Sequence, residues 1–386
     1  MINSIEIKNF KSIKKKLFPL RNLNILLGLN GMGKSSFIQS LLTLKQSSSL
    51  RSLRLDLNGN YVTIGNTRDA LYQYAKQEDM EFDISFTENN SRLNLAFEYK
   101  MEADLFMIKN VKPELLTKFH DNLDKLASNG LFSTNFQYLN ANRIRPVSIF
   151  SKNYTAVINE MNVGNYGEFT AHYIETYSNE DVFFENLAHK DSGIIDNVTR
   201  KKIVNKSLIN QINLWMGEIS PGINIRTTSI SSEDVMLEYV FKQPNFGNTN
   251  RYKPENVGFG ITYVLPVVTA LLAAKRGELI IIENPESHIH PRGQAELGRL
   301  IAKTAMNDVQ IIIETHSDHI LNGIRVAVKE SDITKDRVIA FYFEKVVDAS
   351  EQYSKISDIE IDKNGELSNY PKNMLDEWSN QLFKLM

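Results

Sequence analysis

One short stretch constrains this chain more than any other part of its sequence. Residues Gly28–Ser36 read G-L-N-G-M-G-K-S-S and fit the phosphate-loop pattern G-x-x-x-x-G-K-[ST]. The apolar run Leu23–Leu27 precedes the loop and predicts a buried strand, and Ser35–Leu42 predicts the start of a helix. Because Gly31 and Gly33 allow left-handed backbone and close approach, successive N–H groups can point at one anion. The sequence therefore predicts a strand, a phosphate-binding loop and a helix in that order.

The residues of this loop have separate expected roles. Lys34 is predicted to bridge the β- and γ-phosphates of ATP, and the Ser35 hydroxyl is predicted to coordinate Mg²⁺. The helix that begins here directs the positive end of its dipole at the same place. The residues expected to bind the nucleotide are Asn30, Gly31, Gly33, Lys34, Ser35 and Ser36.

The composition is that of an ordinary soluble globular protein and excludes several classes. The 386 residues, 42% hydrophobic and 23% charged, suffice for two or three packed units. With 44 Lys and Arg against 46 Asp and Glu, the net charge is −2, so no global basic field indicates nucleic acid binding. The absence of cysteine excludes disulfides, thiolate zinc sites and cysteine nucleophiles. We find no signal peptide and no apolar run of about 18 residues, and therefore expect a cytoplasmic protein without membrane contact.

The first hundred residues predict an antiparallel β-subdomain. Ser4–Phe10 alternates in polarity and predicts a strand, and a basic turn, Lys11–Lys16, follows it. Two runs, Leu53–Leu57 and Tyr61–Gly65, flank Asn58-Gly59 and predict a hairpin. Further alternation over 80–87 and 93–99 extends the same pattern.

The middle of the chain reads as a mixed, largely helical insertion. Pro113 opens a predicted helix that Asn129-Gly130 closes, and helical patterns recur over about 181–215 before a Gly- and Asn-rich loop at 243–250. Arg143 and Arg145 alternate around Ile144, so on a strand they would share one face, contacting phosphate of ATP or DNA or pairing with acids. We expect an N-terminal lobe over 1–105, the insertion over 106–250 and a C-terminal lobe over 251–386.

A second group of polar residues follows two apolar strands late in the chain. Leu279–Ile282 is a β-branched run typical of buried parallel strands, and Glu283 stands at its carboxyl end. Val309–Ile313 repeats the pattern and ends in Glu314-Thr315-His316-Ser317. Open α/β sheets place their ligand chemistry at that edge. Glu283 is therefore predicted to hold Mg²⁺ together with Ser35, directly or through water.

The order of these motifs separates the classes of P-loop protein. A glycine signature that opens a helix shortly before the carboxylate strand, with a histidine after the next strand, belongs to ATPases of the ABC type. The Asn-Lys-x-Asp base reader of GTPases is missing, since Asn205–Leu208 lacks the Asp. In the ABC arrangement, Gly258 and Gly260 begin a helix whose amides reach a γ-phosphate held by a second subunit. The fold expected is therefore α/β, an ABC-type head with a mixed sheet, and ATP is expected to join a homodimer.

The motifs resemble those of the SMC/RecF-like branch of ABC ATPases, and more narrowly the overcoming-lysogenization-defect type used in bacterial antiphage defence. Ile7–Ser12 is similar to the first strand of those heads, Glu283–Pro291 to their Walker B motif and D-loop, and Glu314–Ser317 to their switch-histidine motif. The resemblance implies a sensor or clamp subunit in a defence or DNA-maintenance complex. Its implied partners are a nuclease effector encoded nearby and DNA. Only 70 residues follow His316, too few for an appended Toprim nuclease domain of about 100 residues.

One departure from that family bears on catalysis. Where its members commonly have Asp-Glu, this chain has Glu283-Asn284, and an amide cannot act as a general base. We therefore expect slow hydrolysis in which Glu286 assists and Asn284 tunes the rate. His316 is expected to sense the γ-phosphate and orient water.

Four alternatives stay open at this point. Asp358, Glu360 and Asp362 alternate as the metal cluster of a self-contained nuclease would, and Asn284 also fits a non-hydrolysing ATP-bound scaffold. Four of the seven histidines, His288, His290, His316 and His319, lie in this region and suggest a zinc site. The pair His288-x-His290 would bind metal only if a third ligand converged on it. The apolar positions over 373–386 predict a helix that either caps the ATPase core or binds a partner.

Overall fold

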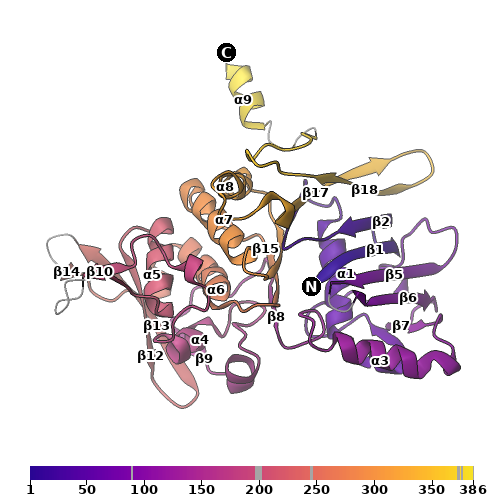
Figure 1. Ribbon diagram of the computed structural model, residues 1–386, viewed down its shortest axis with the longest axis horizontal. Coiled ribbons are helices and arrows are strands. Elements are labelled where there is room, and N and C mark those ends of the chain that lie inside the picture. The colour runs from indigo at the N-terminus through magenta and orange to yellow at the C-terminus, as the bar shows by residue number, and fades with distance from the viewer. Residues whose placement is uncertain (88–89, 196–201, 244–246, 372–373, 375–376, 386) are drawn as a thin grey trace. The chain divides into compact units, whose positions relative to one another are not determined.

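The computed structural model describes residues 1–87, 90–195, 202–243, 247–371, 374 and 377–385 (Figure 1). The chain forms two compact units. The first comprises residues 1–136, 336–361 and 367–386, and the second comprises residues 137–335 and 362–366. No helix among the described residues combines the length and the apolar character needed to cross a bilayer.

The first unit contains the antiparallel sheet that the sequence predicts. Its strand order is β2-β1-β5-β6-β7-β4, and every pair in it is antiparallel. The strands are β1 (Ile2–Phe10), β2 (Ile13–Pro19), β4 (Arg54–Asp56), β5 (Asp79–Phe86), β6 (Arg92–Glu98) and β7 (Leu105–Ile108). Burial alternates along β5 with period two, so one face of the sheet packs on the core.

Two local expectations for this unit are wrong. The segment 61–65 does not pair with β4, which pairs instead with β7. Of the expected hairpin there remains a turn with the isolated bridge Asn58–Thr63 and two backbone hydrogen bonds, from Gly59 to Val62 and from Ile64 to Leu57. The reason is tertiary: Leu55 on β4 and Phe106 on β7 are opposite each other and fully buried, which favours the long-range pairing. Three lysines of the expected basic turn lie instead on β2, and each pairs with a carboxylate: Lys14 with Glu351, Lys15 with Glu6 and Lys16 with Asp358.

A second set of strands in the first unit positions the phosphate loop. Strand β3 (Leu23–Leu27) pairs in parallel with β17 (Val338–Val347), which pairs antiparallel with β18 (Gln352–Ile359). Helix α1 (Lys34–Gln46) follows β3, and its Phe37 ring lies 4.4 Å from that of Phe18 on β2. The Phe18 ring in turn lies 5.3 Å from that of Phe341 on β17. This aromatic contact holds the loop between β3 and α1 against strands far away in sequence.

In the second unit, β15 (Leu279–Glu283) and β16 (Gln310–Glu314) are parallel neighbours, as predicted, and β8 (Phe136–Leu139) lies beside β15. Glu283 is opposite Glu314 in the register, so both strands end at one edge. Helices α6 (Phe259–Ala273), α7 (Pro291–Ala305) and α8 (Asp318–Lys329) belong to the same unit (Figure 1). Helices α7 and α8 cross closely because Gly298 and Gly323 leave no Cβ between the two backbones.

The insertion carries a sheet as well as helices. Strand β13 (Asp234–Gln243) pairs with β12 (Ile223–Ser229), β14 (Gly247–Asn248) and β9 (Ile149–Ser151), and two helices, α4 (Thr170–Tyr177) and α5 (Leu208–Ile219), accompany them. Among the described residues of 181–215, the expected α-helical pattern holds only for α5. Before it, β10 (Gly193–Ile195) pairs with β11 (Lys202–Val204), because β-branched residues there favour strands.

The remaining elements are short. The α-helices are α2 (Thr67–Ala70), α3 (Leu116–Leu126) and α9 (Glu377–Leu385); the single-turn elements are η1 (Ser48–Ser52), η3 (Pro113–Leu115), η4 (Thr155–Asn159), η5 (Glu185–Leu187), η6 (Pro254–Asn256) and η7 (Lys335–Arg337). On α9, Leu382, Phe383 and Leu385 are exposed, so these three side chains do not cap a core.

Candidate functional site

The backbone of the phosphate loop has the predicted conformation. Gly28, Gly31 and Gly33 have φ angles of 133°, 76° and 103°, in the region that favours glycine. A Cβ at Gly28 would overlap the carbonyl oxygen of Phe343 on β17, and one at Gly33 would overlap the hydroxyls of Ser12 and Ser354. Gly31 is exposed, and a Cβ there would meet no atom within 4 Å. Two of the glycines are therefore required by packing as well as by φ.

The lysine and serines of the loop lie where the pattern predicts. Lys34 is 3% exposed, and its Nζ donates hydrogen bonds to the carbonyls of Gly28 (2.8 Å) and Leu29 (2.9 Å). Ser35 is exposed in the first turn of α1, and Asn30 is exposed within the loop. The buried Ser36 shares a hydrogen bond of 3.1 Å with Ser12.

Sequence reasoning missed a residue that supports the loop from behind. Ser354 Oγ on β18 donates to the carbonyl of Met32 (2.6 Å) and shares a second hydrogen bond with Ser12 Oγ (2.8 Å), in which it is the acceptor. No sequence signal points to Ser354, because it lies more than 300 positions from the loop and only the β17–β18 pairing brings it there. Ser354 therefore holds the Met32 carbonyl of the loop, and Ser12 links Ser354 to Ser36 in the first turn of α1.

A cavity of about 330 Å³ adjoins the loop within the first unit. Its wall includes the backbone of Gly31 and the positively charged residues Lys11 and Arg68. Tyr74 and Tyr353 also line it and add aromatic surface. Arg68 is on α2, whose N-terminus is closed by a capping box between Asn66 and Asp69. Burial lowers the pKa of Lys11. Positive charge beside aromatic rings suits the sugar and base of a nucleotide whose phosphates lie in the loop.

The carboxylate strand presents its acid at the sheet edge. Glu283 Oε1 accepts a hydrogen bond of 2.8 Å from the hydroxyl of Tyr138 on β8. Burial raises the pKa of Glu283, while the Tyr138 hydrogen bond and the nearby Arg143 oppose this rise. Asn284 follows in the left-handed region, with φ of 45°, and its N–H donates to the carbonyl of Glu314 (2.8 Å). Asn284, the amide that stands where a general base is expected, is therefore held in a fixed turn.

Arg143 is buried beside the Glu283–Asn284 turn and does not lie on the face of a strand, where the sequence predicts it. It is 3% exposed, and its guanidinium donates to the carbonyls of Glu283 (2.6 Å) and Asn284 (3.1 Å). Arg145 is exposed, and the segment between them is not a strand, so the two arginines do not share a face. Arg143 is a buried structural contact of the turn, and the alternation pattern alone could not show this.

Glu286 and His316 are joined directly. Glu286 Oε2 accepts from the Thr315 hydroxyl (2.8 Å) and Oε1 accepts from the His316 N–H (2.8 Å). Both carboxylate oxygens are thus already in use, which ties the turn after β15 to the turn after β16. The His316 side chain is exposed just before α8, whose N-terminus is capped by Ser317. In this conformation Glu286 acts as a support for the histidine turn.

The two glycines of the signature have different environments. Gly258 is the N-cap of α6, is exposed, and has open space around it. Gly260 is buried, and a Cβ there would overlap the carbonyl of His288. Gly258 is therefore available to a ligand, whereas Gly260 serves the packing of the α6 N-terminus.

The zinc and nuclease alternatives find no support among the described residues. There, His288, His290, His316 and His319 do not converge with a third ligand, and the metal-like group found is made of other residues. Each acid of the proposed nuclease cluster has its own contacts: Asp358 pairs with Lys16, Glu360 pairs with Arg21, and Asp362 accepts backbone N–H groups of its own turn.

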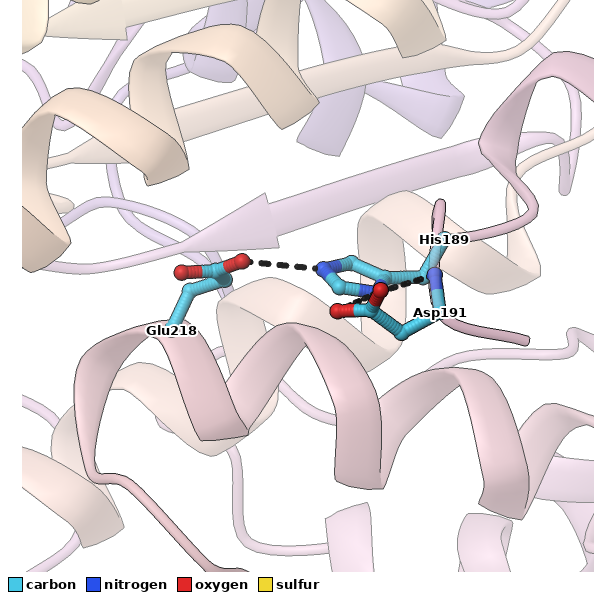
Figure 2. A group of neighbouring side chains, drawn as sticks. All are labelled: His189, Asp191 and Glu218. Atoms are coloured by element: carbon cyan, nitrogen blue, oxygen red, sulfur yellow. Dashed lines mark hydrogen bonds and ion pairs between the residues drawn. The ribbon is translucent and has the colours of Figure 1, made fainter. Parts of the chain in front are cut away.

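That other group, in the second unit, consists of His189, Asp191 and Glu218 (Figure 2). His189 Nδ1 accepts the Asp191 N–H (3.2 Å), so Nε2 carries the proton and donates to Glu218 Oε1 (3.2 Å). Glu218 also pairs with Lys190 at 3.0 Å and Arg292 at 3.4 Å. Although burial alone would raise the pKa of Glu218, its bonds to Lys190 and His189 lower it. Both imidazole nitrogens and the carboxylate are occupied, so this is an ion-pair network that joins α5 to α7.

The structure thus assembles the predicted residues as two groups, one in each unit. The first unit holds the phosphate loop, and the second holds Glu283, Asn284, Glu286, His316 and Gly258. Serine and carboxylate oxygens are donors that Mg²⁺ prefers, so Ser35 in the first unit and Glu283 in the second each have the chemistry of a Mg²⁺ ligand.

Comparison with solved structures supports an ABC-type head. The chain is similar to an SMC head bound to the C-terminal winged-helix domain of ScpA, with 14% identity, a TM-score of 0.53, and coverage of 94% of this chain and 98% of that one. An SMC head with an extended coiled coil, bound to the C-terminal domain of ScpA derived from Pyrococcus furiosus, gives 14% identity, a TM-score of 0.51 and coverage of 100% and 99%. At this identity the likeness shows the fold, an α/β ABC-type ATPase head.

Sequence comparison points the same way. The chain is 30% identical over 104 residues to the DNA replication and repair protein RecF of Francisella tularensis subsp. novicida, which covers 25% of this chain. The same identity over the same length relates it to RecF of Francisella tularensis subsp. tularensis. The chain spans 28% of the length of these curated relatives.

Two family descriptions cover most of the chain. Residues 333–385 match a family of unknown function, DUF3696. Residues 23–322 match AAA_21, described as an AAA domain, putative AbiEii toxin, Type IV TA system. That match includes the phosphate loop, the signature, the carboxylate strand and the histidine turn, and spans more than half of the chain, which therefore belongs to the AAA_21 family.

Proposed function

We propose that this protein binds ATP with Mg²⁺ and hydrolyses it slowly, as a dimer that controls a partner. The observation that carries the proposal is the phosphate loop: three glycines with positive φ, a buried lysine and an adjoining cavity of about 330 Å³. The amides of the loop and of the first turn of α1 would bind the phosphates. Tyr74, Tyr353 and Arg68 would contact the sugar and base.

Phosphoryl transfer requires the protein mainly to position groups and stabilise charge. Lys34, which contacts the carbonyls of Gly28 and Leu29, would turn to the β- and γ-phosphates. Ser35 and Glu283 would hold Mg²⁺, which when bound would neutralise charge on the phosphate oxygens. The exposed His316 would sense the γ-phosphate and orient water.

Slow turnover is proposed because neither Asn284 nor Glu286 is placed to act as the general base for the attacking water. Asn284 cannot take a proton, and both oxygens of Glu286 accept hydrogen bonds from Thr315 and His316. Glu286 could assist only if these bonds were remade with ATP bound. The same observation favours a second candidate, a scaffold that binds ATP without hydrolysing it, and single-turnover hydrolysis of labelled ATP separates the two.

The dimer is proposed because the signature glycine Gly258 is exposed. Gly258 lies at the N-cap of α6 with open space around it, so its amide and those of the first turn could reach a γ-phosphate bound by a second copy. Such sharing would make each ATP site incomplete in the monomer.

The cellular role proposed is that of a sensor or clamp in an antiphage or DNA-maintenance complex in the cytoplasm, acting on an effector nuclease and in contact with DNA. The family description as a putative AbiEii toxin and the similarity to RecF support this role. The solved SMC heads bound to ScpA support the idea that such a head works through a partner.

The experiment measures ATP affinity, hydrolysis and mass in solution for the wild type, Lys34→Ala and Gly258→Asp. We expect Lys34→Ala to abolish ATP binding and Gly258→Asp to bind ATP without dimerising. Mixing the two variants should restore part of the activity, because one composite site then has both intact halves. Unchanged ATP binding in Lys34→Ala would refute the site, and no recovery in the mixture would refute the shared arrangement.

A further inference from the structure

The turn that carries Glu283 and Asn284 is held by residues from a distant segment of the second unit. Arg143 donates to the carbonyls of Glu283 at 2.6 Å and Asn284 at 3.1 Å, from a position that is 3% exposed. Placing a guanidinium out of water is costly unless strong partners receive it. Glu283 and Glu286 are the nearby charges that favour its cationic form. The turn after β15 is thus held by a buried cation, Arg143, that belongs neither to the phosphate loop nor to the other motifs found in the sequence.

The carboxylate of Glu283 is held separately. Tyr138 OH donates to Glu283 Oε1 at 2.8 Å and accepts from Asn140 Nδ2 at 2.9 Å. Because the phenol oxygen receives a hydrogen bond from Asn140, its own proton is directed at Glu283. The side chain of Glu283 and the backbone of the same residue are therefore oriented by two different groups from one segment, residues 138–143.

Two buried atoms in this region have no partner. Among the described residues, Arg143 Nε and Asn284 Oδ1 are the buried side-chain polar atoms that lack a hydrogen bond. Unpaired buried polar atoms are rare, and functional sites are one of the places where they occur. The bond from Arg143 fixes the backbone of Asn284, while the amide oxygen of the same residue stays buried and unpaired.

We propose that Arg143 and Tyr138 are positioning residues for ATP hydrolysis: Arg143 holds the Glu283–Asn284 turn through its carbonyls, and Tyr138 orients the Glu283 carboxylate. This inference rests on the proposed ATPase function. Neither residue touches the nucleotide; each acts through Glu283 or Asn284. Because Glu286 joins this turn to Thr315 and His316, a loss of Arg143 would also loosen the histidine turn.

The test uses the full chain and three conservative variants. Arg143→Lys keeps the charge but cannot bind two carbonyls in a fork, and Tyr138→Phe removes only the hydroxyl. Arg145→Lys is the matched control, since Arg145 is exposed two positions away. For each variant we would measure kcat and KM for ATP, the Kd of a fluorescent ATP analogue, the thermal midpoint, and amide hydrogen exchange over 283–289 without nucleotide.

We expect Arg143→Lys and Tyr138→Phe to lower kcat by about 10- to 100-fold, as loss of outer-shell partners typically does, with Kd changed less than about threefold. Exchange over 283–289 should rise in Arg143→Lys and stay unchanged in Arg145→Lys. A purely structural role would lower the thermal midpoint without separating kcat from Kd.

The outcomes distinguish the two proposals. If the wild type hydrolyses ATP and both variants have its kcat, the positioning role is refuted and the ATPase stands. If the wild type binds no ATP, the proposed function fails, and unchanged exchange in Arg143→Lys would then refute the hold on the turn as well. If Arg143→Lys does not fold, Tyr138→Phe alone decides, because it removes one oxygen atom and no charge.

Discussion

The phosphate loop allows a sharp test of whether its glycines are needed for conformation, for space, or for both. Gly28→Ala places a Cβ at a φ of 133° and against the carbonyl oxygen of Phe343. Gly31→Ala places one at a φ of 76° with no atom within 4 Å. The two substitutions add the same methyl group to the same loop, so Gly31→Ala is the matched control for Gly28→Ala.

The expected magnitudes differ because one site is crowded. A left-handed alanine at position 31 costs about 1 to 2 kcal/mol. At position 28 the backbone strain is about 1 to 3 kcal/mol, and overpacking against a strand that is hydrogen-bonded on both sides adds about 1 to 3 kcal/mol. We therefore expect Gly28→Ala to lower the free energy of unfolding by about 3 to 5 kcal/mol, about 2 to 3 kcal/mol more than Gly31→Ala.

The assay is urea unfolding followed by circular dichroism, with ATP affinity measured on the folded protein. Gly28→Ala should have the lowest urea midpoint, and Gly31→Ala should unfold between Gly28→Ala and the wild type. If the two variants unfold at the same midpoint, the close approach of Gly28 to Phe343 does not constrain the loop, and the reasoning from Cβ contacts is wrong.

Two further predictions concern single side chains. Asn284→Glu supplies a general base, and we expect the ATPase rate to rise by at least about tenfold. If the rate and the lifetime of the ATP-bound dimer both equal those of the wild type, position 284 does not tune turnover. Glu278, just before β15, accepts the Lys275 N–H at 2.9 Å, and its burial raises its pKa to about 7. Because the folded state then binds the proton more tightly, wild-type stability falls relative to Glu278→Gln as pH rises from about 4.5 to 7. The side chain is only partly buried, so we expect the free energies of unfolding in urea to differ by about 1 to 2 kcal/mol at about pH 8 and not at about pH 4.

Much of the site was predictable because its signals are local. The phosphate loop combines a short pattern with a strand before it and a helix after it, and the structure has all three. The parallel strands that end in Glu283 and Glu314 were predictable from two apolar, β-branched runs, since only buried strands tolerate them. The helix that starts at Gly258 was predictable in the same way.

Local patterns failed where a distant partner competes. The Asn58-Gly59 turn predicts a hairpin, but β4 pairs with β7 because Leu55 and Phe106 bury each other there. The helical spacing over 181–215 gave way to a β10–β11 pair before α5. In both cases local propensity differs by fractions of a kcal/mol per residue, less than burial of one large side chain contributes.

The sequence by itself determined the ABC-type fold class, the phosphate loop, the carboxylate edge and the unusual Asn284, because each depends on residues adjacent in the chain. Only the tertiary structure showed that Ser354 supports the loop, that Gly28 faces Phe343, and that Tyr138 and Arg143 hold the Glu283–Asn284 turn. These contacts join positions more than 100 residues apart, and their energy comes from burial and hydrogen bonds that exist only after the strands have paired.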